Sequence, residues 1–134
     1  MSDASLRSVA ESARENAYAP YSRFRVGAAL RAEDGRVFAG ANVENGAYGL
    51  GICAERSAVA AAVSAGARTF DALALVSDSE GPVPPCGACR QVLAEFAPEL
   101  RVTSYGQNGE VAEWTVDELL PHRFRLHDSD GTTT

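Results

Sequence analysis

Hydrophobic positions recur with two different periods along the first forty residues. Leucine, valine and alanine side chains between Ser5 and Ala17 fall on one stripe of a helix, which we expect Pro20 to close. Between Phe24 and Leu30 every second residue is apolar, and after a polar, glycine-containing stretch at 33–36 the chain is apolar again from Val37 to Ala39. The chain therefore begins with a predicted amphipathic helix, followed by a predicted β-hairpin.

Helix-like and strand-like segments alternate over the rest of the chain. Ala54 to Ala65 is rich in alanine, a strong helix former, and Gly66 follows where a left-handed residue can close the helix. The remaining predicted elements are a helix from Cys86 to Phe96, strands at Phe70 to Val76, Arg101 to Tyr105 and Val111 to Trp114, and a short last helix whose start carries a Thr115 and Glu118 capping-box pattern. This order predicts an α/β fold in which helices cover a sheet and a ligand binds at strand ends.

Length and composition bound the class of protein. At 134 residues the chain fits a single domain, 1–134, in which we expect a flexible tail at about residues 127–134. With 46% hydrophobic and 22% charged residues and no apolar run of membrane-spanning length, the composition is typical of a soluble globular protein. The first twenty residues lack the apolar core of a signal peptide, so we expect a cytoplasmic location and no membrane partner.

The net charge of −6 limits the choice of partner, because polynucleotides are usually held by clustered basic residues. The basic residues of this chain are arginines, and they are scattered along the sequence. We therefore expect no nucleic acid partner, and the charge favours a small, uncharged substrate.

Three cysteines form a candidate metal centre. Cys86 and Cys89 are three residues apart at the start of a predicted helix and share one helix face, while Cys53 stands at the start of another helix. Helix N-termini favour thiolates, and an odd number of clustered thiols favours a metal over disulfides. A zinc ion with three protein ligands keeps a fourth position for water. The two histidines, His122 and His127, lie near the C-terminus, away from these segments.

Glu55 and Arg56 stand beside the first cysteine and suggest chemistry for the site. A carboxylate next to a metal-activated water can take up a proton and return it to a substrate, although an acidic residue in a first helical turn also simply offsets the helix dipole. Arg56 could donate hydrogen bonds to the sulfurs and compensate the excess negative charge of three thiolates, or it is a solvated helix residue. A closed structural zinc site and redox-active or unliganded thiols are the alternatives for the cysteines.

Four segments resemble one known family: YAPYSRFRVGAAL, GANVENGAYGLGICAER, GPVPPCGACRQVLAEF and WTVDELLPHRF. Their residues and order are similar to those of the small zinc-dependent cytidine deaminases that act on free nucleosides, and the resemblance covers nearly the whole chain. It implies a three-layer α/β/α sandwich around a mixed five-stranded sheet. It also implies a homotetramer with active sites at subunit borders.

The resemblance implies roles for several residues outside the metal centre. The family's loop before the first zinc cysteine grips the ribose through an asparagine and a glutamate, which correspond to Asn42 and Glu44; taken alone, these residues also fit an ordinary turn. Phe24 would pack beside the base, although its alternating strand position also fits a core residue. Backbone groups of Ala54 would hold the pyrimidine edge.

Two aromatic residues match positions that family members lend to a neighbouring subunit's pocket. These are Tyr48 and Phe124, for which loop packing and a C-terminal hydrophobic anchor are the other interpretations. The chain departs from the family pattern at His122-Arg123, where smaller residues are expected, and at Gly51, a place that is often threonine.

The function implied by the resemblance is hydrolytic deamination of cytidine and deoxycytidine to uridine and deoxyuridine, with release of ammonia, in pyrimidine salvage. One Zn²⁺ per subunit would be held by Cys53, Cys86 and Cys89, with Glu55 moving protons between water and the base. Two alternatives are an aminonucleoside-antibiotic deaminase with the same metal site and a non-catalytic zinc-binding interaction protein. The NVEN loop at 42–45 favours cytidine over the antibiotic.

Overall fold

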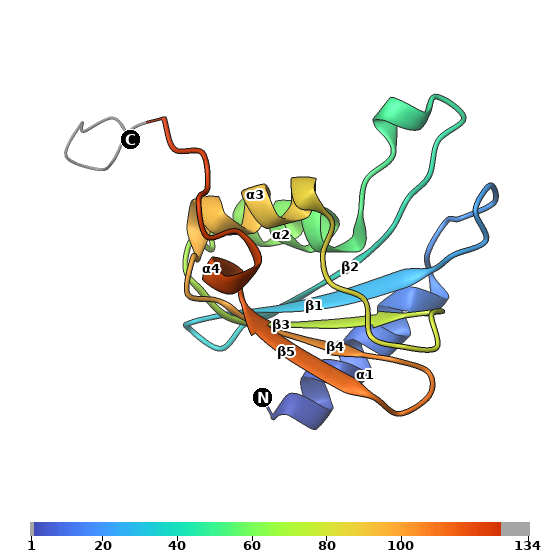
Figure 1. The fold of residues 1–134 in the computed structure, drawn as a ribbon, viewed down its shortest axis with the longest axis horizontal. Coiled ribbons are helices and arrows are strands. Elements are labelled where there is room, and N and C mark those ends of the chain that lie inside the picture. Colours follow the sequence, from blue (N-terminus) through green and yellow to red (C-terminus); the bar gives the residue numbers. More distant parts are fainter. Residues whose placement is uncertain (1, 127–134) are drawn as a thin grey trace.

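The computed structural model describes residues 2–126, so the tail expected at residues 127–134 lies outside the described part (Figure 1). The helices are α1 (Asp3–Glu15), α2 (Ala54–Ser64), α3 (Gly87–Phe96) and α4 (Val116–Leu119), with a short 3-10 helix, η1, at Tyr48–Leu50. The strands are β1 (Val26–Ala32), β2 (Val37–Ala41), β3 (Phe70–Ser77), β4 (Arg101–Tyr105) and β5 (Val111–Thr115). Within the described range, no helix has the length and apolar character needed to span a membrane.

The strands form one mixed sheet of five in the order β2-β1-β3-β4-β5. β1 runs antiparallel to both of its neighbours, β2 and β3, whereas β3 and β4 are parallel and are connected through α3. β5 closes the far edge antiparallel to β4. The predicted hairpin and the predicted mixed five-stranded sheet are thus confirmed.

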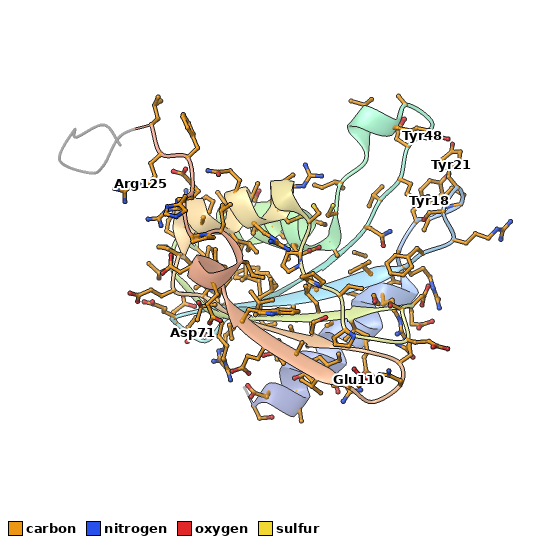
Figure 2. All side chains as sticks on the ribbon, viewed as in Figure 1. Tyr18, Tyr21, Tyr48, Asp71, Glu110 and Arg125 are labelled. Carbon is orange, nitrogen blue, oxygen red and sulfur yellow. The ribbon has the colours of Figure 1, made fainter. Side chains whose placement is uncertain are left out.

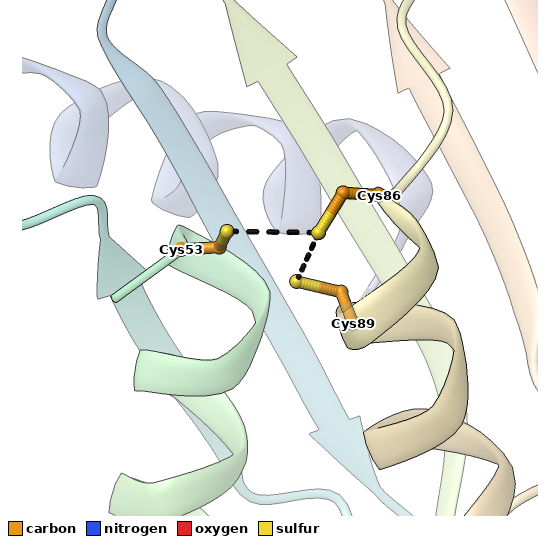
Figure 3. Close-up of side chains that lie close together, drawn as sticks. All are labelled: Cys53, Cys86 and Cys89. Atoms are coloured by element: carbon orange, nitrogen blue, oxygen red, sulfur yellow. Dashed lines mark hydrogen bonds between the residues drawn. The ribbon is translucent and has the colours of Figure 1, made fainter. Parts of the chain in front are cut away.

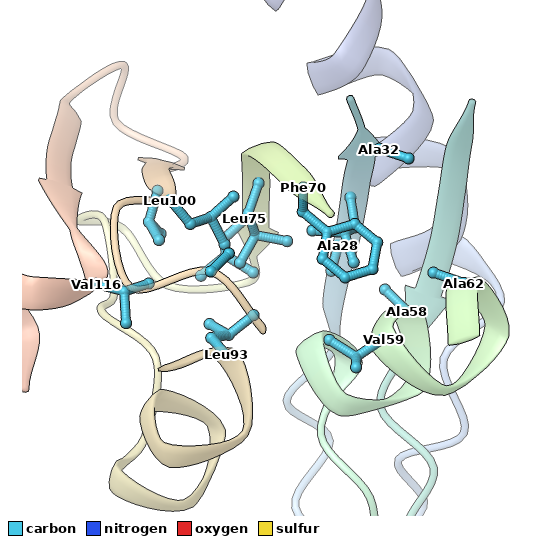
Figure 4. Packing of buried hydrophobic residues seen from close by; sticks show 14 of the residues in the cluster. Ala28, Ala32, Ala58, Val59, Ala62, Phe70, Leu75, Leu93, Leu100 and Val116 are labelled. Atoms are coloured by element: carbon cyan, nitrogen blue, oxygen red, sulfur yellow. The ribbon is translucent and has the colours of Figure 1, made fainter. Parts of the chain in front are cut away.

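Helices cover both faces of the sheet, α1 on one face and α2 and α3 on the other (Figure 1). Side chains alternate between the faces: Ala28 and Leu30 of β1 belong to the core under α2 and α3, whereas Ala29 between them packs in the cluster around α1. Figure 4 shows the larger core, where Leu75 of β3 and Leu93 of α3 are buried. The result is the expected three-layer sandwich.

The first helix occupies α1 rather than the predicted range of Ser5 to Ala17. It begins at Asp3 because the Ser2 side chain accepts a hydrogen bond from the Ser5 amide and caps the helix. It ends at Glu15, with Asn16 as its C-cap, well before Pro20, so the proline does not terminate it. The capping box predicted for the last helix is confirmed: Thr115 and Glu118 cap the start of α4 reciprocally.

Gly40 allows α2 to lie directly on β2. A Cβ atom at Gly40 would stand 2.4 Å from the Ala54 carbonyl oxygen and 2.4 Å from the Ala58 amide nitrogen, both backbone atoms of α2. Any side chain there would push the helix away from the sheet, because these contacts are far shorter than van der Waals separations. The first turn of α2, which carries Glu55, is thereby fixed against the sheet.

Candidate active site

The three cysteines come together between the N-termini of α2 and α3 (Figure 3). Cys53 and Cys86 are the N-cap residues of these two helices, and Cys89 lies in the first turn of α3. The Cys53 and Cys86 sulfurs are 3.8 Å apart and the Cys86 and Cys89 sulfurs 3.4 Å apart. These distances exclude disulfide bonds, whose sulfurs are about 2.05 Å apart, so none of the three cysteines is in a disulfide.

The arrangement of the sulfurs suits a zinc ion. The three ligand atoms lie within 4.8 Å of one another, and sulfurs about 2.3 Å from a tetrahedral zinc ion are separated by about 3.8 Å. Across residues 2–126, no fourth cysteine, histidine or carboxylate joins this group. Three protein ligands beside a pocket are typical of a catalytic zinc site, whereas a structural site is closed by a fourth.

The cysteines differ in their proton affinity. A hydrogen bond from Cys89, assisted by Arg56 and opposed by burial, lowers the pKa of Cys53 to about 5. The same Cys53–Cys89 interaction, together with burial, raises the pKa of Cys89 well above its usual range. The metal-free cluster therefore holds a thiolate at Cys53 and a protonated thiol at Cys89, and metal binding has to release protons.

Arg56 points its guanidinium at this cluster. It follows Cys53 by three residues on α2, so both lie on one side of the helix, and its Nη2 donates to the Cys53 sulfur at 3.7 Å. The interaction with Cys53 raises the pKa of Arg56. The Arg56 Nε atom is buried without a hydrogen-bond partner. A fixed positive charge therefore faces the sulfurs, where it offsets thiolate charge.

We expect Arg56→Gln to weaken zinc binding or lower the turnover of cytidine by about 10-fold to 100-fold, the range for groups that support metal ligands. The physical reason is the loss of a cation that stabilises the Cys53 thiolate. Zinc affinity by chelator competition and kcat by uridine formation measure the two effects. Arg36→Gln removes an equal charge from the exposed turn between β1 and β2 and serves as the control. Unchanged values for Arg56→Gln would remove Arg56 from the mechanism.

Glu55 is buried beside the sulfurs, with 6% of its surface exposed. It lies in the first turn of α2, which Gly40 holds against the sheet. Burial, together with the nearby Cys53 thiolate, raises the pKa of Glu55 to about 7. A carboxyl group with that pKa can hold and release a proton near neutral pH.

A pocket of about 350 Å³ joins the metal-binding thiols to the predicted substrate residues. Phe24, Asn42, Glu44 and Ala54 line it together with Cys53, Cys86 and Glu55. Residues from the segment before β1, the loop after β2 and two helix starts thus meet at one end of the sheet. The pocket has the volume of a small-molecule site.

The side chains of Asn42 and Glu44 are already bonded to the chain. Asn42 clamps the segment before β1, since its Oδ1 accepts from the Val26 amide at 2.8 Å and its Nδ2 donates to the Phe24 carbonyl at 2.9 Å. Glu44 accepts from the Tyr21 and Ser22 amides at 3.0 and 3.1 Å. Both residues shape the pocket wall, and each keeps a free hydrogen-bonding position, because an amide and a carboxylate offer more sites than these bonds use.

Tyr48 and Phe124 are not among the residues that line this pocket. Tyr48 is 82% exposed on a projecting arm formed by residues 43–52, where its ring centroid lies 6.2 Å from that of Tyr21 (Figure 2). Phe124 is 70% exposed, and its backbone carbonyl accepts a hydrogen bond from Gln91 of α3. Within one subunit this pocket therefore brings together metal ligands, Glu55 and four predicted substrate residues. Tyr48 instead lines a neighbouring pocket with Glu44 and Ser22, whereas Phe124 lines neither pocket.

Five pocket residues were not predicted from the sequence: Ser22, Val26, Leu75, Val83 and Pro84. Val26 and Leu75 read as ordinary strand residues, and Val83 and Pro84 belong to a loop without periodicity. The loop is held by Ser104, whose hydroxyl donates to the Val83 carbonyl at 2.7 Å. Only Ser22 carried a usable signal, because it stands two residues before the predicted base-contacting Phe24.

Comparison with known proteins agrees with this geometry. Residues 1–107 match the family described as "Cytidine and deoxycytidylate deaminase zinc-binding region". The chain is 55% identical over 123 residues to a cytidine deaminase from Sporosarcina psychrophila, covering 90% of each protein. It is also 55% identical over 117 residues to a cytidine deaminase from Halalkalibacterium halodurans, covering 87% of this chain and 89% of that protein.

A solved structure gives the same result in three dimensions. The crystal structure of cytidine deaminase from Burkholderia pseudomallei superposes with a TM-score of 0.89 at 50% sequence identity, covering 92% of this chain and all of the other. The sequence match thus spans the segments that carry the cysteines and Glu55, and the fold match extends over nearly the whole chain. On these grounds the chain belongs to the zinc-binding cytidine and deoxycytidylate deaminase family.

Proposed function

We propose that this protein hydrolyses cytidine and deoxycytidine to uridine and deoxyuridine, with release of ammonia. One observation carries the proposal: a buried carboxyl group, Glu55, lies at the same pocket as the cysteines, whose three thiols fit one zinc ion. A metal site with an open position and an adjacent proton carrier suits hydrolysis of an amino group on a base. The high identity to cytidine deaminases supports cytidine as the substrate.

Cys53, Cys86 and Cys89 would hold one zinc ion per subunit. When bound, zinc would supply Lewis-acid chemistry, because it lowers the pKa of a water molecule and makes a nucleophile available near neutral pH. The two helix N-termini and Arg56 would stabilise the thiolates that this requires.

Glu55 would act as the proton carrier of the reaction. Its carboxylate accepts a proton from the attacking water and delivers it to N3 of the cytosine ring, while the water oxygen becomes bonded to C4. A second proton passes through the same carboxyl group to the exocyclic amine, which leaves as ammonia. Burial of Glu55 keeps bulk water from competing for these protons.

The pocket wall would orient the nucleoside. The Phe24 ring packs beside the base, and the Ala54 amide, which belongs to the helix-initial N–H groups without an intrahelical acceptor, can donate to the pyrimidine edge. Asn42 and Glu44 would use their remaining hydrogen-bonding positions for the sugar hydroxyls. The base would thus lie toward Glu55 and the sugar toward the loop after β2.

A substrate panel tests this proposal. Purified zinc-loaded protein is incubated with cytidine, deoxycytidine, an aminonucleoside antibiotic and a cytosine-containing oligonucleotide, and ammonia is measured. We expect turnover of both nucleosides and none of the oligonucleotide, since the arginines are scattered and the net charge is −6. Turnover of the antibiotic alone, or of the oligonucleotide alone, would contradict the proposal.

The working enzyme would be a homotetramer with shared pockets, acting in pyrimidine salvage in the cytoplasm. Large hydrophobic side chains stand exposed on the projecting arm, at Tyr48 and Leu50, and in the segment before β1, at Tyr18 and Tyr21. Phe124 is exposed as well. Figure 2 labels the three tyrosines. Such groups are typical of surfaces that a partner covers. In this arrangement Tyr48 and Phe124 reach the pocket of a neighbouring subunit.

Native mass spectrometry measures the assembly, and we expect a tetramer. Tyr48→Ala is expected to lower the tetramer fraction and the turnover of cytidine together, because the exposed Tyr48 side chain would be covered by a neighbouring subunit and does not line the thiol-containing pocket of its own subunit. A monomer with full activity would contradict the shared-pocket arrangement.

A further inference from the structure

Ser22 lies between the two halves of the substrate pocket, and its hydroxyl contacts both. The Ser22 Oγ donates a hydrogen bond to Oε2 of Glu44 and accepts one from the Phe24 amide at 3.0 Å. Glu44 is the residue proposed for the sugar and Phe24 the residue proposed for the base. A single hydroxyl group therefore links the sugar side of the pocket to the base side.

The Glu44 carboxylate is held by three donors from this segment. Its Oε1 atom accepts from two backbone amides, those of Tyr21 and Ser22, whereas its Oε2 atom has the Ser22 hydroxyl as its partner. The hydrogen bond from the Ser22 side chain lowers the pKa of Glu44, so the carboxylate stays charged. Because Oε1 is occupied by both amides, Oε2 is the atom with capacity for a ligand hydroxyl, and Ser22 sets its direction.

Pocket residues hold both backbone polar groups of Phe24, its N–H and its carbonyl. Ser22 holds its N–H group, and Asn42 holds its carbonyl at 2.9 Å. Arg23, which lies between Ser22 and Phe24 in the chain, has a φ of 59°, a left-handed conformation that costs a non-glycine residue about 1 kcal/mol. Unfavourable backbone conformations persist where surrounding contacts hold them. Here the Arg23 amide donates to the Ala19 carbonyl at 3.0 Å, and Ser22 and Glu44 hold the residues on either side of it.

We propose that Ser22 is a positioning residue for nucleoside binding, whose hydroxyl fixes the Glu44 carboxylate and the Phe24 ring relative to each other. The proposal rests on the function proposed above, in which Glu44 binds the sugar. Ser22 does not touch the thiols or Glu55 through any hydrogen bond in the described structure, so its effect falls on binding rather than on proton transfer.

Steady-state kinetics with cytidine test this role. Ser22→Ala is expected to raise KM about tenfold, the size of one hydrogen bond to a charged group, and to leave kcat within about twofold. Ser22→Thr keeps the hydroxyl and is expected to restore KM to within about threefold of the wild type. An unchanged KM in Ser22→Ala, or a fall in kcat at constant KM, would overturn the proposal.

A double-mutant cycle shows whether Ser22 acts through Glu44. If it does, adding Ser22→Ala to Glu44→Gln changes KM by less than about twofold, because the bonded partner has already been altered. A full tenfold increase in that background would overturn the proposal. Ser64→Ala, at the exposed end of α2, is the control and leaves KM unchanged.

Binding of uridine, measured by calorimetry, separates this proposal from the proposed function. Uridine requires no turnover, so Ser22→Ala should weaken its binding about tenfold whether or not cytidine is deaminated. A wild type that binds uridine but leaves cytidine unchanged would contradict the proposed function alone. Equal uridine affinities of the wild type and Ser22→Ala would contradict the role of Ser22.

Discussion

Glu55→Gln is expected to lower kcat for cytidine by at least about a thousandfold while the protein keeps its zinc. General acid–base groups contribute about 100-fold to 10,000-fold, and Glu55 serves two proton transfers in the proposed reaction. Glutamine has nearly the same shape but cannot carry a proton between water and the base. Zinc remains because the three sulfurs form the ligand group without Glu55.

The same substitution is expected to stabilise the metal-free fold. Burial raises the pKa of Glu55 from 4.5 to about 7, so the charged form is less favourable in the folded chain than in the unfolded chain. Glutamate and glutamine therefore differ little below pH 4.5, and the stability lost to the charged glutamate grows as the pH rises toward 7. Metal-free Glu55→Gln is expected to unfold at a higher temperature than the metal-free wild type at pH 8.

Turnover, zinc content and melting temperature together check this prediction. Glu95→Gln makes the same chemical change on the exposed face of α3 and serves as the matched control, with activity and zinc expected to match the wild type. A Glu55→Gln variant with nearly normal kcat would refute the assigned role. Loss of zinc from this variant would instead place Glu55 among the metal ligands.

Cys86→Ser is expected to remove most of the zinc and, with it, the turnover of cytidine. Serine keeps the shape of cysteine, but its neutral hydroxyl is a poor ligand for zinc compared with a thiolate. The fold should persist because Cys86 is exposed at the N-cap of α3, a position that serine favours. Loss of metal would therefore not be a result of unfolding.

Metal analysis by mass spectrometry and far-UV circular dichroism measure the two parts of this prediction. We expect zinc to fall from about one ion per subunit to below about 0.1 with an unchanged helix signal. Ser57→Ala changes an α2 side chain that is not a metal ligand, and it is the control for handling and metal loading. Full zinc occupancy and activity in Cys86→Ser would contradict the three-cysteine site.

The elements of the fold were predictable where a local signal set them. The apolar periods placed the hairpin and the central strand β3, and the capping pair Thr115 and Glu118 marked the start of α4. Helix α1 differed because its cap, Ser2, lies outside the apolar stripe from which its range was inferred. Local sequence thus determines element type more firmly than element ends.

The candidate site was predictable only in part, for a similar reason. Cys86 and Cys89 share a helix turn and could be paired from spacing, but their approach to Cys53 depends on how α2 and α3 pack across the same face of the sheet. The contact between Ser22 and Glu44 joins residues 22 positions apart in two loops without periodicity. Such contacts arise from the tertiary fold, and no spacing rule along the chain encodes them.

One measurement tests the central claim most directly: the mass of the uridine that the zinc-loaded protein forms from cytidine in ¹⁸O-labelled water. Hydrolysis at C4 predicts one ¹⁸O atom in each uridine molecule and one ammonia released per uridine. Absence of uridine, or uridine without the label, would contradict a hydrolytic deaminase built on the three cysteines and Glu55.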